Sequence, residues 1–387
     1  MQVFKEILSN WMGRLGLFIL LSLTVLSFLV IIISPGDIVA KWNSPEYWLY
    51  NPRLAMPSWV NYLGFNLPET KIIKLQKHIS QSSGPIYVGE VFWDYSSTPS
   101  EVVIEIESGS DNALVMLSLR RPDGLEIRLI EKVVSQRGVF RFNIDLDEEI
   151  RRAVQSALGS GEPSRIIFLD NKGNILKGSY RFLGNIYNFG QGEVYVRVIL
   201  YGRVYGIAGT DDMRRDIFLG MMYGIPIAFL FGVATAFSTT FIQAFFGIIA
   251  GWFGRRIDIV IDRLADIFLL LPFIPVLITI AVFIGKFTLV MLFYVVVLLS
   301  MFGSITKATR SYVLQLKNSA YIEAARIAGA GNFWIITRHI MPAVLPFIFA
   351  NAVISVPTYI YLEAALSLIG FGDPFLPTLG KIIERAF

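Results

Sequence analysis

The feature that most constrains the fold of this chain is an apolar stretch, residues 217–254, that contains no charged side chain. A helix needs about 20 apolar residues to cross the hydrocarbon core of a bilayer. The stretch is therefore long enough for an interfacial lead-in and one full span near 225–250. Over all 387 residues only 17% are charged, whereas soluble domains average about 25%. The sequence predicts a membrane protein.

Further apolar segments predict a polytopic protein with five visible spans. Residues 15–33 carry no charge and follow Lys5 and Arg14. This run is too long for the hydrophobic part of a signal peptide, which is usually about 7–15 residues. We therefore expect a retained transmembrane helix at 15–34 after a cytoplasmic N-terminus at 1–14. The other expected spans are 266–285, 287–306 and 341–362.

A polar region separates the first expected span from the second. Residues 35–216 contain no further span, and from 85 to 202 short runs alternate apolar and polar side chains between turn-forming sequences. Such alternation is typical of half-buried strands. One amphipathic helix is predicted at 147–158. The predicted strands are 101–107, 114–120, 125–130, 139–144, 165–169 and 193–201. We expect a β-rich inserted domain, in the form of a β-sandwich with one helix.

Basic loops predict the orientation of the chain in the plasma membrane. Cytoplasmic loops of membrane proteins carry an excess of lysine and arginine. The loop at 251–265 carries three arginines and the loop at 303–339 carries both lysines and arginines, whereas the short turn at 285–286 has only Lys286. Both basic loops should therefore be cytoplasmic, which agrees with a cytoplasmic N-terminus. The same rule puts the region 35–216 outside the cell.

The loop at 318–342 combines small, charged and helix-forming residues between two apolar spans. Asn318 or Ser319 can cap a helix at its start. The alanines that share one stripe of this helix are Ala320, Ala324, Ala325 and Ala328. A stripe of methyl groups suits close docking against another protein, with Glu323 and Arg326 as charged anchors. An ordinary solvated loop helix is the alternative.

Two glycines end this predicted helix. Gly329 and Gly331 stand where glycines commonly terminate helices, and Asn332 can start a second helix that leads into the last span. The loop should therefore form a short helix on the cytoplasmic face that turns sharply at the two glycines. We expect His339, near the start of the last span, to be an interfacial elbow residue and not a catalyst or ligand.

Several kinds of site are excluded or disfavoured by the composition. The chain has no cysteine and only two histidines, so thiolate chemistry is absent and a multi-histidine metal site is not expected. No GxxxxGK[ST] sequence is present, so the chain lacks a phosphate cradle of this kind and ATP must be bound by another polypeptide. The net charge of +4 comes mainly from basic residues beside apolar spans, so no nucleic-acid partner is expected.

The loop resembles the EAA loop of permeases of ABC importers, whose pattern is EAA-x3-G-x9-I-x-L-P. In this chain Glu323, Ala324 and Ala325 are followed after three residues by Gly329, and after nine more by the sequence HIMP, residues 339–342. Histidine at the isoleucine position resembles the dipeptide/oligopeptide/nickel subfamily of these binding-protein-dependent permeases, in which RHILP is usual.

Other motifs of that subfamily follow in order. GTDDMRRD (209–216) resembles its GTDxxGRD, with Arg214 in place of the glycine. RLADIFLLLP (263–272) keeps its Arg-x-x-Asp and downstream proline, and EAALSLIGFG (363–372) resembles its EAALSFLGLG. PTLG (377–380) resembles its P-x-W-G, with leucine replacing tryptophan.

The resemblance implies an α-helical polytopic fold, the type I ABC importer permease fold, with the permease core at 217–387. The family carries a sixth span after the P-x-W-G region, whereas this sequence ends at Phe387. The implied partners are a second permease subunit, two cytoplasmic ABC ATPase subunits that hold ATP and Mg, an extracytoplasmic substrate-binding protein and membrane lipid. The chain itself is then not an enzyme and needs no cofactor. The implied cargo is a peptide or a related small solute such as an oligosaccharide.

The resemblance also assigns roles to residues. Those implied to couple the chain to the ATPase are Glu323, Ala324, Ala325, Arg326, Gly329, Gly331, His339 and Pro342. The candidates for the transport pathway or its gates are Asp266, Gln243 and Glu363. For each candidate a simpler interpretation exists: Gln243 can bond a neighbouring helix, and Glu363 can serve helix-end packing.

Three acidic residues in the 251–265 loop and the span after it suggest two different interpretations. Asp258, Asp262 and Asp266 are four residues apart, so they share one helix face. Such a face could hold a metal ion or relay protons. Pairing with nearby arginines is the simpler expectation, and the candidates are Arg255, Arg256 and Arg263.

Two alternatives for the whole chain stay open at this point. A proton-coupled secondary transporter would use Asp266 and Glu363 as a relay and would need no ATPase. A membrane-anchored binding or adhesion protein would place the function in the β-rich domain and would need no EAA loop.

Overall fold

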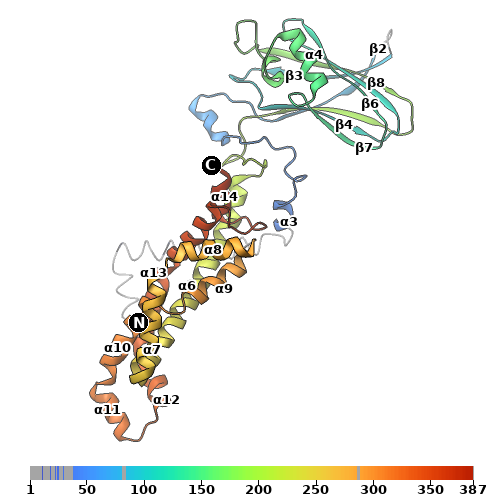
Figure 1. Cartoon of the computed structure of the whole chain (residues 1–387). Coiled ribbons are helices and arrows are strands. Elements are labelled where there is room, and N and C mark those ends of the chain that lie inside the picture. The colour runs from blue at the N-terminus through green and yellow to red at the C-terminus, as the bar shows by residue number, and fades with distance from the viewer. Residues whose placement is uncertain are drawn as a thin grey trace. The chain divides into compact units, whose positions relative to one another are not determined.

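The computed structural model describes residues 38–80, 84–285 and 288–386, together with positions 11, 18, 22, 24, 25 and 29. The expected first span at 15–34 therefore lies largely outside the described residues. The chain divides into two compact units. One is Ser44–Phe218, called here the β unit. The other, the membrane unit, is formed by Met1–Asn43 and Leu219–Phe387. Figure 1 shows the elements of both.

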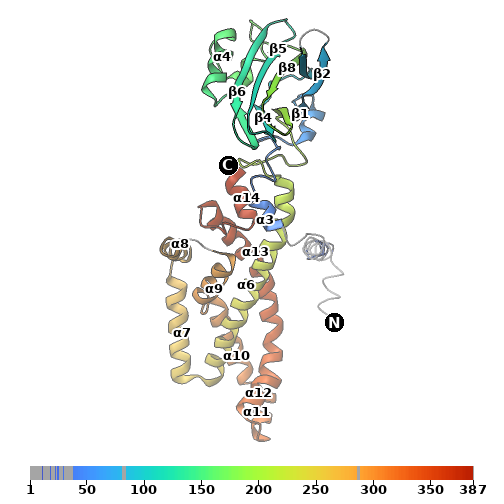
Figure 2. The ribbon, with the colours of Figure 1, turned by 90° about the vertical axis from the view of Figure 1, so that its right-hand side faces the viewer.

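The β unit is built on two antiparallel sheets (Figure 2). Among the described residues, one sheet has the strand order β1-β9-β4-β7 and the other the order β2-β3-β8-β5-β6. The strands are β1 (Lys71–Lys74), β2 (Gln76–Ser80), β3 (Gly84–Trp93), β4 (Glu101–Ser108), β5 (Ala113–Arg120), β6 (Glu126–Val134), β7 (Gly138–Asn143), β8 (Gly178–Asn188) and β9 (Val194–Tyr201). The strands thus begin earlier than residue 85, where the β-rich region was expected to start.

One apolar core lies between the two sheets. Along β5 the side chains alternate between buried and half-buried, which is the pattern that the sequence predicts for a strand with one face on a core. Trp93 of β3 and Ile104 of β4 are fully buried in the same apolar cluster, although they belong to different sheets. Burial of each such side chain stabilises the fold by about 1.5–3 kcal/mol.

The predicted helix of the β unit is present as α4 (Glu148–Leu158). Asp147 caps it, because its Oδ1 accepts hydrogen bonds from the backbone N–H groups of Glu149 and Ile150 at 3.0 and 3.2 Å. Ile150 and Val154 are buried in the core cluster, and α4 packs against β6 (Figure 2).

The prediction of a strand at 165–169 is wrong. This segment holds the one-turn helix α5 (Pro163–Ile166), followed by a turn. Proline fits the first turn of a helix because it has no N–H to lose there. Ile167 and Phe168 are nevertheless buried, so the apolar run fills the core, and of its residues only Leu169 pairs, in an isolated bridge with Ile175. The apolar pattern was real, but it did not specify the backbone.

Two helices of the membrane unit are long and apolar enough to cross a membrane by themselves. The first is α6 (Ile217–Phe253). The second is the continuous helical segment Asn332–Leu368, made of α12 (Asn332–Ile335), a π-helical turn η2 (Ile336–Ile340) and α13 (Met341–Leu368). The membrane unit also contains two short helices, α3 (Ile38–Trp42) and α14 (Leu379–Ala386).

The expected spans at 266–285 and 287–306 are not single straight helices. The first is divided between α7 (Arg255–Leu270) and α8 (Phe273–Ile284), which are bent by 78°. The second is divided between α9 (Leu289–Leu299) and α10 (Ser304–Lys317), bent by 45°. If each bent pair is one span, the described residues contain up to four. Pro272 explains the first break, because a proline at this position cannot donate the helical hydrogen bond.

Glycines let α6 approach its neighbours closely. A Cβ atom on Gly247 would lie 2.6 Å from the carbonyl oxygen of Thr306, and one on Gly251 would lie 2.9 Å from that of Arg310. Both acceptors belong to α10. The GIIAG sequence (247–251) therefore serves packing between helices within the membrane unit, as small residues four apart commonly do.

Candidate functional site

The loop at 318–342 folds into a short helix that projects from a buried base. This helix is α11 (Ala320–Ile327). Ile322 on its inner side is fully buried, and it shares an apolar cluster with Ile335 of α12 and Ile340 of η2. The cluster also includes Ile248, near the end of α6. The helix is therefore fixed by burial on one side only.

The outer side of α11 carries small side chains that are exposed. Ala320, Ala324 and Ala328 are exposed, whereas Ala325 is half-buried against the apolar cluster. Beyond this stripe, the side chain of Ile327 is 84% exposed and that of Phe333, on α12, is 80% exposed. Large apolar side chains with such exposure mark an interaction surface when they cluster beside a helix. We call the exposed residues of α11 together with Phe333 the docking face.

The two predicted charged anchors of α11 are placed differently. Glu323 is exposed and forms no ion pair with any residue that the structure describes. Arg326 instead lies over the indole of Trp252, with its guanidinium carbon 4.7 Å from the ring centroid. Lys317 also contacts Trp252 and donates a hydrogen bond to its carbonyl oxygen at 2.6 Å. Trp252, at the end of α6, is a part of the site that the motif did not indicate.

The two glycines of the loop differ in conformation. Gly329 follows α11 with φ of +84°, in the left-handed region that side chains with a Cβ rarely adopt. Gly331 has φ of −71°, which any residue can adopt, and it precedes α12. The sharp turn after α11 therefore depends on Gly329 and not on Gly331.

His339 and Pro342 lie where α12 passes into α13. The imidazole of His339 lies between the rings of Tyr321 and Trp334, at centroid distances of 5.9 and 5.1 Å. Pro342 has no N–H to donate to the carbonyl of Arg338, and the helix passes through a π-helical turn just before it. His339 is thus an aromatic packing residue that joins α11 to the base of α13.

The acidic residues of α7 pair mainly with α10, and not with the neighbouring arginines that we expected. Asp258 binds Arg310, with an Oδ2 to Nη2 distance of 2.7 Å, and Lys307 forms ion pairs with Asp262 and Asp266. Only Arg263, of the three arginines considered, contacts this set, at 3.7 Å from Asp266. Among the described residues no group of His, Cys, Asp and Glu is arranged to hold a metal ion. The carboxylates join α7 to α10.

Gln243 bonds a neighbouring helix. Its Nε2 donates to the carbonyl oxygen of Ser300 at 2.7 Å, and its Oε1 accepts from the backbone N–H of Ile305 at 3.3 Å. These two backbone groups flank the break between α9 and α10. The amide thus holds α6 to the bend and supplies partners to backbone groups that the bend frees.

Glu363 is buried near the end of α13. Its side chain is 1% exposed, and its Oε1 accepts a hydrogen bond from Ser367 at 2.8 Å. Asp266 is engaged with Lys307 of α10, so the two acids of the alternative proton relay have different partners.

The GTDDMRRD segment closes a compact loop within the β unit. Asp211 pairs with Arg215 at 2.6 Å, and Thr210 Oγ1 donates to the carbonyl oxygen of Pro52 at 2.8 Å. Gly209 has φ of +78°, and a Cβ there would lie 2.1 Å from the carbonyl oxygen of Ala55. This loop also holds the first residue of α6, because Ile217 donates its backbone N–H to the carbonyl of Gly209 at 3.1 Å.

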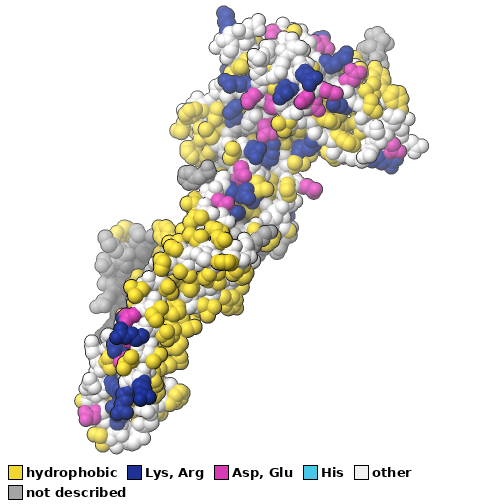
Figure 3. Space-filling view, in the orientation of Figure 1, with side chains coloured by type: hydrophobic (Ala, Val, Ile, Leu, Met, Phe, Trp, Pro, Cys, Tyr) yellow, Lys and Arg dark blue, Asp and Glu magenta, His cyan; other side chains and the backbone are white. Residues whose placement is uncertain are grey.

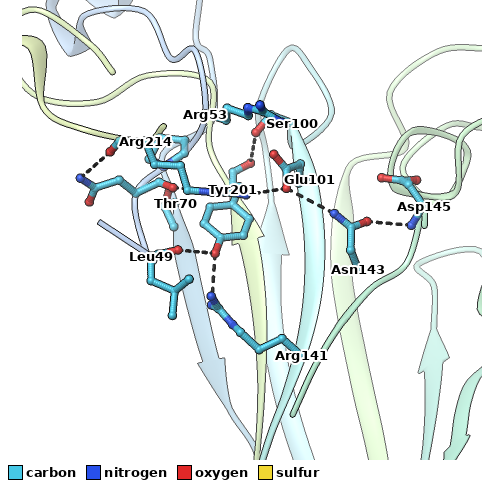
Figure 4. Close-up of polar contacts among 12 residues, drawn as sticks. Leu49, Arg53, Thr70, Ser100, Glu101, Arg141, Asn143, Asp145, Tyr201 and Arg214 are labelled. Atoms are coloured by element: carbon cyan, nitrogen blue, oxygen red, sulfur yellow. Dashed lines mark hydrogen bonds and ion pairs between the residues drawn. The ribbon is translucent and has the colours of Figure 1, made fainter. Parts of the chain in front are cut away.

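Arg214 occupies the position at which the related motif has glycine. Its φ is +67°, in the left-handed region. Its side chain reaches the sheet of β4 and β9 (Figure 4): Nη2 lies 2.6 Å from Glu101 Oε2, and the guanidinium carbon lies 4.1 Å from the centroid of the Tyr201 ring. Its Nη1 also donates to the carbonyl of Asn51 at 2.7 Å. We call Arg214, Glu101 and Tyr201 the arginine clasp.

Tyr201 is fixed on several sides. Its hydroxyl donates to the carbonyl of Leu49 at 2.7 Å and accepts from Arg141 at 3.2 Å (Figure 4). Burial raises the pKa of the Tyr201 phenol, while the positive charges of Arg214 and Arg141 act in the opposite direction. Tyr201, the last residue of β9, thus has a phenol that lies near two cations, Arg214 and Arg141.

The chain resembles known transport proteins over its second half. Residues 243–381 match the sequence model of the family described as "Binding-protein-dependent transport system inner membrane component". The chain is 36% identical over 168 residues to the oligopeptide transport system permease protein OppC of Bacillus subtilis, which covers 43% of the chain and 54% of that relative. It is 32% identical over 166 residues to the dipeptide transport system permease protein DppC of the same organism, with 42% and 51% covered.

A third relative has a different name. The peptidoglycan transport system permease protein YejE of Agrobacterium fabrum is 31% identical over 185 residues, which are 46% of the chain and 46% of that relative. The chain spans about half the length of the curated relatives that it matches.

Proposed function

We propose that the chain is a permease subunit of an ATP-driven ABC importer, because residues 243–381 match the model of the family described as binding-protein-dependent transport system inner membrane component. The family resemblance drawn from the motifs is confirmed by this match and by the relatives named as oligopeptide and dipeptide permeases. We propose that its cargo is a peptide or a related small solute, such as an oligosaccharide.

The observation that supports this proposal most directly is the docking face. A helix that is buried on one side, is lined with methyl groups on the other and carries the exposed Glu323 is suited to enter a groove of a partner protein. Ile327 and Phe333 add apolar area at its tip. In our proposal the partner is a cytoplasmic ABC ATPase subunit, and the residues with the coupling role are those of the EAA loop.

Movement of the ATPase would reach the spans through the contacts of α11. Arg326 and Lys317 tie the helix to Trp252 at the end of α6, and Ile322 ties it to Ile335 and thus to α12 and α13. The pairs between α7 and α10 extend this body of helices. Such a packed group moves as a rigid body, because buried contacts have few alternative arrangements. The proposed result is alternating access of a central pathway.

The proposal implies several partners. We propose that two ATPase subunits bind ATP and Mg, and that a second permease subunit and an extracytoplasmic substrate-binding protein complete the transporter. We propose a plasma-membrane location with a cytoplasmic N-terminus and with the region 35–216 outside. In this arrangement the β unit contacts the binding protein or the companion permease.

Charge reversal of Glu323 tests the coupling role. Glu323→Arg should abolish co-purification of the ATPase subunits and import, because it places a cation on the docking face while leaving the buried side of α11 intact. Glu69→Arg in the β unit is a matched control, since Glu69 is also exposed and acidic. Gly329→Trp should have the same effect as Glu323→Arg through the turn.

Membrane insertion must survive in every variant for the test to be valid. Unchanged ATPase association in Glu323→Arg and Gly329→Trp would refute the assignment of the docking face. Transport that persists without any ATPase and follows a proton gradient would refute the ABC importer as a whole.

A further inference from the structure

An uncharged segment of the β unit exposes several large apolar side chains close together in the sequence. The sequence LAMPSWVNYLGFNLP, residues 54–68, contains no Asp, Glu, Lys or Arg. It includes the 3-10 helix η1 (Ser58–Leu63). Its exposed apolar residues, with their exposed fractions, are Tyr62 (92%), Leu63 (67%), Leu54 (64%), Met56 (56%), Phe65 (56%) and Trp59 (51%). We call these six residues the apolar patch. Figure 3 shows hydrophobic side chains gathered over η1.

The patch is held in place by hydrogen bonds, so its exposure is built into the fold. The backbone N–H of Ser58 donates to the carbonyl of Gly206 at 2.9 Å, and the Trp59 indole donates to that of Ile207 at 3.0 Å. Asn61 closes the far end of η1, because its Nδ2 donates to the carbonyl of Leu67 and its Oδ1 accepts from the backbone N–H of Leu67. Ile207 is itself 61% exposed and extends the patch.

The patch is anchored close to the start of a membrane-spanning helix. Ile207, which binds Trp59, is two residues before Gly209, and Gly209 accepts the hydrogen bond from Ile217, the first residue of α6. Two residues of extended chain reach at most about 7 Å. Ile207, which holds Trp59, therefore lies within about 7 Å of Gly209, the residue that binds the first residue of α6.

The length of α6 places this neighbourhood at the edge of a bilayer. The helix has 37 residues, which at 1.5 Å per residue gives about 55 Å. The hydrocarbon core is about 30 Å thick, and about 40–45 Å with the headgroups. Arg255 and Arg256 follow the last residue of α6, so this end of the helix marks one surface of the bilayer. The first turns of α6 then lie at or just beyond the headgroup layer of the opposite surface.

We propose that the apolar patch is a membrane-interface anchor that inserts into the headgroup and upper acyl region of the leaflet beside the start of α6. Its composition fits lipid, because tryptophan and tyrosine concentrate at bilayer interfaces, where an apolar ring and a polar tip are both accommodated. No Asp, Glu, Lys or Arg interrupts the segment between Leu54 and Pro68, although Arg53 and Glu69 flank it. The patch would thereby fix the β unit to the bilayer surface.

The absence of cysteine allows a direct test with single labels on the full-length chain. Tyr62→Cys and Leu63→Cys place a nitroxide spin label in the patch at two independent positions. Phe189→Cys is the matched control, because Phe189 is also an exposed aromatic residue of the β unit, at 69%, and lies in the connection between β8 and β9. The chain is reconstituted in nanodiscs of phosphatidylcholine and phosphatidylglycerol.

The readout is collision of the label with oxygen, which concentrates in lipid, and with a water-soluble nickel chelate. We expect the ratio of oxygen to nickel accessibility to be at least fivefold higher at positions 62 and 63 than at 189. Equal ratios at all three positions would overturn the proposal. So would labels at 62 and 63 that stay accessible to nickel in nanodiscs and become protected only when the other transporter subunits are added, because the patch would then bind protein.

Discussion

The arginine clasp gives the sharpest test of how the GTDDMRRD loop is stabilised. Arg214 has a left-handed backbone, where a residue with a Cβ pays about 1–2 kcal/mol. Its side chain opposes this cost through the ion pair with Glu101 and the contact with Tyr201. Both partners of the ion pair are mostly buried, with side chains 20% and 21% exposed. The loop should therefore depend on the side chain of Arg214 and not on its backbone.

The size of the effect follows from these contacts. A hydrogen bond to a charged group contributes about 1.5–3 kcal/mol, and a partly desolvated cation–π contact about 0.5–2 kcal/mol. Allowing for the exposed fifth, we expect Arg214→Ala to lower the free energy of local opening by about 2–4 kcal/mol. This corresponds to roughly 30- to 800-fold faster amide exchange, since each 1.4 kcal/mol is about tenfold.

Arg214→Gly separates the backbone from the side chain. It loses the same contacts, but glycine enters the left-handed region freely, at the cost of about 0.5–1 kcal/mol of extra chain entropy. The glycine variant should therefore be about 0.5–1 kcal/mol more stable than the alanine variant. Glu101→Gln, alone and with Arg214→Ala, isolates the ion pair as a double-mutant cycle.

Hydrogen exchange followed by mass spectrometry on the full chain in nanodiscs measures local opening in peptides that cover 209–216. A change below threefold in Arg214→Ala would show that the clasp does not hold the loop. A glycine variant that exchanges as fast as the alanine variant, or faster, would show that the backbone at Arg214 is not strained.

Three further predictions follow from single positions. Gly329→Ala should impair import and ATPase coupling, because alanine at a φ of +84° costs about 1 kcal/mol of backbone strain. Gly331→Ala should behave like the parent, since its φ of −71° suits any residue. Equal behaviour of the two variants would contradict the assignment of the turn to Gly329. Arg310→Asp should lower the melting temperature in detergent, because Arg310 of α10 pairs with Asp258 of α7. Adding Asp258→Arg should restore at least half of the lost melting temperature. A double variant no more stable than the single variant would contradict this pairing. The folded-state pKa of Tyr201 lies above the usual tyrosine value of about 10. The contribution of Tyr201 to stability is therefore complete below a pH of about 10 and is lost as the pH rises through the folded-state pKa. The absorbance difference at about 295 nm between the parent and Tyr201→Phe should show no tyrosinate from Tyr201 until the pH exceeds about 10.

The sequence predicted well those helices and strands that are determined by neighbouring residues along the chain. The alternating pattern at 114–120 specified β5, and the acidic start and apolar spacing of 147–158 specified α4, because strand and helix periods are local properties. The helix in the EAA loop was predicted for the same reason. β3 was missed because Gly89 interrupts its pattern; a Cβ at Gly89 would lie 2.7 Å from Ile73, so this glycine serves close packing inside a strand.

What the sequence could not show depends on residues far apart. The spacing of Asp258 and Asp262 put them on one helix face, but their partners on α10 are more than 40 positions away and could not be chosen over nearer arginines. The bend between α9 and α10 contains no proline; Gly303 and the Gln243 amide accompany it instead. Arg214 was visible only as a departure from a motif, and its partner Glu101 was not indicated at all.

The two ends of α6 connect these separate findings. At its start, Ile217 is bonded to the loop that the arginine clasp holds to β9, and at its end Trp252 lies beneath Arg326 of the docking face. A continuous helix transmits displacement along its axis, because its backbone hydrogen bonds resist stretching. Pro226 lies inside α6, where a missing hydrogen bond makes bending easiest, so we expect any bend of α6 to occur there.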